Sequence, residues 1–252
     1  MNEEAGMNGN IVNTLTLATA VLFVLLGAGG LALAQDAKAP YPTMAPIDQY
    51  LIADRNAEID LAKSAAPAAV SSDAAVLVLG KDGYQTAVEG KNGFTCLVER
   101  SWMSPTDSPE FWDPKLRGPV CYNPPAVRSI LPYTIKRTGL ILAGVSKAQM
   151  TEQFKAALAS NELKVPEPGA MSYMMSKGAY FGDGAGHWHP HLMFHIPTAE
   201  GASWGANLRD SPIILNDEFP TGPEPETVFM VTVDHWSDGT PFSVDASATH
   251  RH

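Results

Sequence analysis

The stretch "AAVLVLGKDGYQTAVEGKNGFTCLVER", residues 74–100, has the pattern of strands joined by tight turns. Three short apolar or β-branched runs are separated by two turn sequences, Asp82-Gly83 and Asn92-Gly93. Glycine supplies the positive φ of a tight hairpin turn, so these pairs between apolar runs are strong hairpin signals. The pattern therefore predicts a three-stranded antiparallel meander.

Helical patterns lie on both sides of a long proline-rich loop. Ser146 and Gln149 have the spacing of a capping box, Asp48 is a candidate cap, and Pro132 predicts a break within its segment. We expect helices over residues 47–65, 124–137 and 146–163.

The last third of the chain returns to strands. Glycine and proline separate the strand patterns, which cover residues 170–176, 187–197, 211–217 and 226–236. Strands, then helices, then strands predict an α+β fold with a mostly antiparallel sheet and helices packed on one face. We expect one domain over residues 47–245, a linker over 35–46 and a disordered tail over 246–252.

The N-terminus has the pattern of an export signal. An apolar run from Ile11 to Ala34 ends in Ala32-Leu33-Ala34, a small-x-small cleavage pattern. We expect a signal peptide over residues 1–34. The alternative is an uncleaved anchor, because the run is long enough to span a bilayer. Both alternatives place the rest of the chain outside the cytoplasm, in the periplasm or secreted.

The two cysteines and the charge narrow the class of protein. Cys96 and Cys121 are expected to form a structural disulfide, since the compartment is oxidising. The formal net charge of −10 and the lack of clustered Lys and Arg exclude nucleic acid as a partner. Membrane contact is expected only through an uncleaved N-terminal segment. The small-molecule substrate and the oligomeric state are not specified by the sequence.

Residues 187–195 hold four of the seven histidines. Read with a period of two, the odd positions are His187, His189, His191, Met193 and His195. The even positions are Trp188, Pro190, Leu192, Phe194 and Ile196. This alternation predicts a strand with an apolar core face and a face of imidazoles.

Imidazole is the commonest metal ligand in proteins, so the histidine face predicts a metal site. Strand positions two apart are separated by about 7 Å, which lets neighbouring odd positions converge on one ion. We expect two or three ligands from His187, His189 and His191, with a bulge at Pro190 bringing in the outer one. His195 is too far along a regular strand to join them.

The rest of the site must come from other segments. The candidate ligands are His235, Asp183, Glu99, and Met174 or Met175. Glu99 and Asp183 are candidate general bases, although a buried ion pair is the alternative role for Glu99 and its neighbour Arg100. The expected cofactor is a divalent transition metal, with zinc first and copper or iron as alternatives.

Three motifs, "NGFTCLVERSW", "GDGAGHWHPHLMF" and "WGANL", resemble a family of uncharacterised secreted bacterial proteins. The resemblance covers residues 46 to about 240, and the histidine motif is its most distinctive part. It implies export and a single domain. It implies no activity.

Together these patterns predict an exported metal-binding protein. The first hypothesis is a metalloenzyme that uses the histidine cluster for water activation or oxidation. The alternatives are a non-catalytic metal-handling protein, and a ligand-binding module whose histidines respond to pH.

Overall fold

The computed structural model describes residues 41–182, 189–197, 201–215 and 226–243. The predicted signal peptide and tail, together with Asp183 and His187, lie outside the described residues. All described residues belong to one compact unit. None of the helices in these ranges combines the length and the apolar composition that a membrane span requires.

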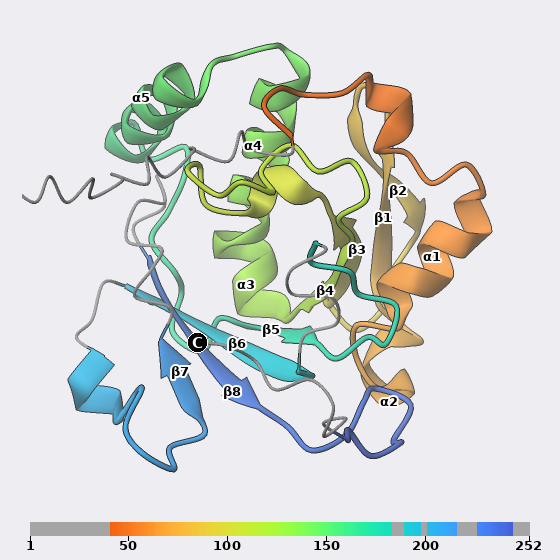
Figure 1. Cartoon of the computed structure of the whole chain (residues 1–252), viewed down its shortest axis with the longest axis vertical. Helices are drawn as coiled ribbons and strands as arrows, with labels where there is room; N and C mark the ends of the chain where they lie inside the picture. The colour runs from red at the N-terminus through yellow and green to blue at the C-terminus, as the bar shows by residue number, and fades with distance from the viewer. Residues whose placement is uncertain (1–40, 183–188, 198–200, 216–225, 244–252) are drawn as a thin grey trace, which may run out of the picture. The chain divides into compact units, whose positions relative to one another are not determined.

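Eight strands of the described residues form one sheet in the order β2-β1-β3-β4-β5-β6-β8-β7 (Figure 1). The strands are β1 (Ala75–Gly80), β2 (Gly83–Val88), β3 (Thr95–Glu99), β4 (Gly118–Tyr122), β5 (Met171–Met174), β6 (His191–Pro197), β7 (Ile213–Leu215) and β8 (Glu226–Thr232). Every pairing is antiparallel except that of β1 with β3. The predicted α+β fold with a mostly antiparallel sheet is confirmed.

The predicted meander over residues 74–100 is wrong in its third strand. The β1–β2 hairpin forms as expected, but β3 pairs with β1 in parallel instead of with β2. A side chain at Gly90 would collide with the backbone of Ala75, so glycine lets the chain pass close to β1 on its way back. Most of β2 is exposed or half-buried, whereas β3 is buried along most of its length, so β3 takes the central place.

The helical segments are η1 (Ile47–Gln49), α1 (Arg55–Lys63), α2 (Ala68–Ser71), η2 (Ser101–Met103), α3 (Pro124–Ser129), α4 (Leu131–Leu142), α5 (Lys147–Ala159) and η3 (Gly201–Trp204). The capping box at Ser146 and the break before Pro132 are confirmed. The long helix expected from residue 47 is wrong. It starts at Arg55, because Asp54 accepts hydrogen bonds from the first-turn amides and caps it.

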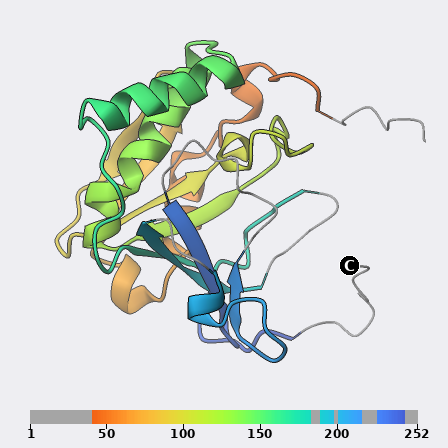
Figure 2. The ribbon, with the colours of Figure 1, turned by 90° about the vertical axis from the view of Figure 1, so that its left-hand side faces the viewer.

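Alternate residues of the central strands face two different helical layers. Leu97 and Val120 pack with Leu131 in the layer of α3 and α4. Cys96 and Cys121 pack with Ala62 of α1. The expectation that helices cover one face of the sheet is wrong, because α1 packs against the other face. Figure 2 shows α4 and α5 side by side, and the stacked rings of Tyr133 and Phe154 join them.

Two buried interactions fix β3 in this arrangement. Cys96 and Cys121 are directly opposite each other on β3 and β4 and form the predicted disulfide. Arg100, fully buried, pairs with Glu58 of α1 at 2.8 Å and also donates to the carbonyl of Tyr50. The buried ion pair is therefore made with α1, and Glu99 points to the opposite face of the sheet.

Candidate functional site

The histidine face of β6 is its buried face. His191 and His195 are 3% and 4% exposed, whereas Leu192, Phe194 and Ile196 are only half-buried. The expectation that the even positions form the core face is therefore wrong. Met193 is opposite Ser172 of β5, and Ser172 is opposite Tyr122 of β4. Residues in such a row lie on one face, so the odd positions of β6 share the side of the sheet that α3 and α4 cover.

His195 lies between a hydroxyl and a carboxylate. Its Nε2 is 3.0 Å from Oγ of Ser172, and its Nδ1 is 2.9 Å from Oε2 of Glu226. With Glu226 ionised, its carboxylate can only accept, so we assign the imidazole proton to Nδ1, which donates a hydrogen bond to Glu226. In the neutral imidazole, Nε2 is then the acceptor for the Ser172 hydroxyl.

The strand register brings these three residues together. Ser172 is opposite Met193, and His195 follows on the same face of β6. On the other side, His195 is opposite Val228 and Pro197 is opposite Glu226. Ser172, His195 and Glu226 therefore come from three adjacent strands, which hold the serine and the carboxylate on opposite sides of the imidazole.

A second pair of polar groups adjoins the first. Tyr122 is the β4 neighbour of Ser172, and its ring centre is 6.3 Å from that of His195. Its hydroxyl donates to Oε1 of Glu99 at 2.5 Å and lies 3.2 Å from Oγ1 of Thr134 on α4. We call Glu99, Tyr122, Ser172, His195 and Glu226 the polar cluster.

Burial dominates the electrostatics of the polar cluster. It raises the pKa of the Glu99 carboxyl, although the hydrogen bond from Tyr122 opposes the shift. Burial and the neighbouring Glu99 hold the pKa of Tyr122 well above its usual value, so the phenol stays protonated. The cluster approaches solvent at Glu226, whose side chain is 17% exposed, while Ser172 is fully buried.

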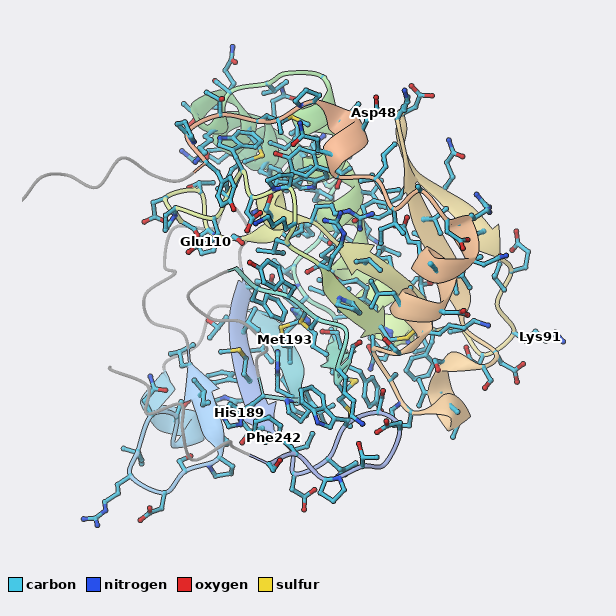
Figure 3. All side chains as sticks on the ribbon, turned by 45° about the vertical axis from the view of Figure 1, so that its right-hand side comes forward. Asp48, Lys91, Glu110, His189, Met193 and Phe242 are labelled. Atoms are coloured by element: carbon cyan, nitrogen blue, oxygen red, sulfur yellow. A yellow bond between two sulfur atoms is a disulfide. The ribbon has the colours of Figure 1, made fainter. Side chains whose placement is uncertain are left out.

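The predicted metal ligands lie at the opposite end of β6. His191 is buried, and its Nδ1 donates to the carbonyl of His189 at 2.7 Å. Figure 3 shows the ring of His189 beside Phe242, with 4.3 Å between ring centres. His235 is half-exposed and pairs with Asp234 at 2.6 Å.

These positions do not by themselves make a closed metal site. Among the residues that the structure describes, no three His, Cys, Asp or Glu side chains are grouped to hold an ion. Burial lowers the pKa of His191, which favours the neutral imidazole that ligation requires. The metal ligands and the base roles of Glu99 and Asp183 stay predictions.

Comparison with family models, curated proteins and solved structures finds no match. The resemblance seen in the sequence therefore stays a prediction, and the function has to be argued from the site.

Sequence reasoning missed Ser172, Tyr122 and Glu226, and set His195 aside. The signals were weak: a serine in an otherwise apolar strand pattern, and a glutamate at the start of another. Only the register of β4, β5, β6 and β8 brings these residues to one place.

Proposed function

We propose that the chain is an exported hydrolase or acyltransferase with Ser172 as nucleophile, His195 as base and Glu226 as the group that orients the imidazole. One observation carries the proposal: the unbroken hydrogen-bonded chain from Ser172 through both nitrogens of His195 to Glu226. A nucleophile within reach of a base that a third group orients is the geometric signature of nucleophilic catalysis.

With the proton of His195 on Nδ1, Nε2 is free to act as the base for Ser172. Oγ of Ser172 attacks the carbonyl carbon of an ester while its proton passes to Nε2 of His195. The imidazolium that forms is stabilised by Glu226 and then protonates the leaving alcohol as its C–O bond breaks. Water repeats the sequence on the acyl-enzyme, releases the acid and regenerates Ser172.

Tyr122 is the donor that this proposal assigns to the developing oxyanion. Its phenol is protonated, and its strand position neighbours that of Ser172. A hydrogen-bond donor fixed near the reacting carbonyl is usually the largest single contribution to stabilising the transition state. The phenol has a single O–H, which Glu99 accepts in the resting state and which turns to the oxyanion when that charge develops.

The surroundings support a reaction centre more than a purely structural network. A buried carboxylate and imidazole cost free energy that apolar side chains would not, and the polar cluster lies in a layer of apolar packing. Glu226 is partly exposed, so the proposal has substrate approach Ser172 from its side. The disulfide between β3 and β4 is consistent with a periplasmic or secreted enzyme.

Ester hydrolysis tests the proposal. Purified protein is assayed against p-nitrophenyl esters of increasing acyl length, beside Ser172→Ala and the matched control Ser129→Ala. Ser129 is also a buried serine, 1% exposed, and bonds to the carbonyl of Pro125. We expect hydrolysis by the wild type and the control and none by Ser172→Ala. Equal hydrolysis by Ser172→Ala contradicts the proposal.

Metal binding at His189 and His191 is the second candidate function. The observation that favours it is the Nδ1 bond from His191 to a backbone carbonyl, the contact by which ligating histidines are commonly oriented. Zinc is the first expectation, with copper or iron as alternatives. Elemental analysis of the untagged protein should find stoichiometric metal that His191→Ala loses and His235→Ala keeps. Metal-free wild type would exclude this function.

A further inference from the structure

Three methionines surround His191 on the covered face of the sheet. Met174 of β5 is directly opposite His191, and Met193 follows two positions along β6. Met230 of β8 is opposite Met193. Met174 and Met230 are buried, at 8% and 6% exposure, and Met193 is half-buried, so the four side chains share one face of the sheet.

The register sets the distances between these side chains. Directly opposed residues have Cβ atoms about 5 Å apart, and residues two apart on one strand are separated by about 7 Å. A methionine side chain is long and unbranched, with a polarisable thioether that adapts to its surroundings. The sulfur atoms of Met174, Met193 and Met230 can therefore reach an ion placed above His191.

The donor set of this methionine–histidine group is soft. Thioethers and thiolates select Cu(I), whereas carboxylate and water suit harder ions. Both cysteines are in the disulfide, so thioether is the sulfur ligand that this chain offers. The Nδ1 bond to the carbonyl of His189 directs Nε2 of His191 to the side away from that carbonyl.

We infer a Cu(I) site formed by Nε2 of His191 and the thioether sulfurs of Met174, Met193 and Met230. This inference rests on the metal-binding function proposed for His191 and does not depend on the Ser172 chemistry. It names monovalent copper where the sequence pointed first to zinc.

Competition titrations test the site. The full chain is titrated anaerobically with Cu(I) against a colorimetric copper chelator, and separately with Zn²⁺. We expect one equivalent of Cu(I) to bind more tightly than Zn²⁺. Mutation of groups that only support metal ligands lowers metal affinity by about 10–100-fold. Loss of two ligands in Met193→Leu/Met230→Leu should therefore lower the Cu(I) affinity by at least that factor. The control Met150→Leu changes a fully buried methionine of α5 and should bind as the wild type does.

Each outcome decides between the proposals. Binding of Zn²⁺ without Cu(I) overturns the copper site but keeps metal binding, and binding of neither overturns both. Unchanged Cu(I) affinity in the double variant excludes Met193 and Met230 as copper ligands. X-ray absorption of the copper-loaded wild type needs no variant: sulfur scatterers support the site, and a shell of nitrogen and oxygen alone overturns it.

Discussion

Glu226→Gln isolates the contribution of the carboxylate that contacts His195. Glutamine keeps the shape of the side chain but removes the charge that stabilises the imidazolium. Its amide also offers Nδ1 a donor, which favours the tautomer that cannot accept the proton of Ser172. We therefore expect folded protein with strongly reduced ester hydrolysis.

The size of the effect follows from the geometry. Nδ1 of His195 and Oε2 of Glu226 are 2.9 Å apart, with side chains 5% and 17% exposed. The charge centres are then separated by about 4 Å, and at an effective dielectric constant of about 20 their attraction is about 4 kcal/mol. Since about 1.4 kcal/mol changes a rate tenfold, kcat/KM should fall roughly 10³-fold.

The assay compares kcat/KM for the best ester in wild type, Glu226→Gln and Glu167→Gln. Glu167 pairs with Arg128 at the surface at 2.7 Å, so it is a matched removal of a paired carboxylate away from the polar cluster. The control should keep its activity within about twofold, as surface changes usually do. A loss of less than about tenfold in Glu226→Gln would refute the assigned role.

Three further predictions concern stability. Glu58→Gln leaves the buried charge of Arg100 without its carboxylate and should cost about 3–5 kcal/mol in urea denaturation, whereas Glu152→Gln in an exposed pair should cost under about 1 kcal/mol; similar losses would contradict this account. Reducing the disulfide, whose cysteines are 25 residues apart, should lower the unfolding free energy by about 3 kcal/mol, measured with and without reductant; no change would contradict the expected loss. Burial raises the pKa of Glu99 above its usual 4.5, so folding loses stability as pH rises through that value, because the unfolded chain releases the proton first. Glu99→Gln should therefore gain stability relative to wild type as the pH rises above about 4.5 in denaturation curves, and a constant difference would count against the shift.

Local patterns predicted most of the fold. The capping box at Ser146, the helix break before Pro132 and the hairpin at Gly83 depend on neighbouring residues, and the structure has all three. The pairing of β3 was missed, because an antiparallel meander and a parallel return have the same local pattern. Burial of both faces of β3 decides between them, and that depends on the whole sheet.

The candidate site was harder to predict for the same reason. The histidine alternation showed a two-faced strand but not which face is covered, since α3 and α4 select the covered face. Ser172 and Glu226 meet His195 only through pairing between strands far apart in the sequence. No pattern within one segment could have brought them together.

The most direct test of the account is covalent labelling of Ser172. A small fluorophosphonate is incubated with the full chain, and the modified peptide is identified by mass spectrometry. The account predicts one label, on Ser172, that His195→Ala reduces strongly and Ser129→Ala leaves unchanged. A folded protein that takes up no label, or that is labelled equally without His195, would contradict it.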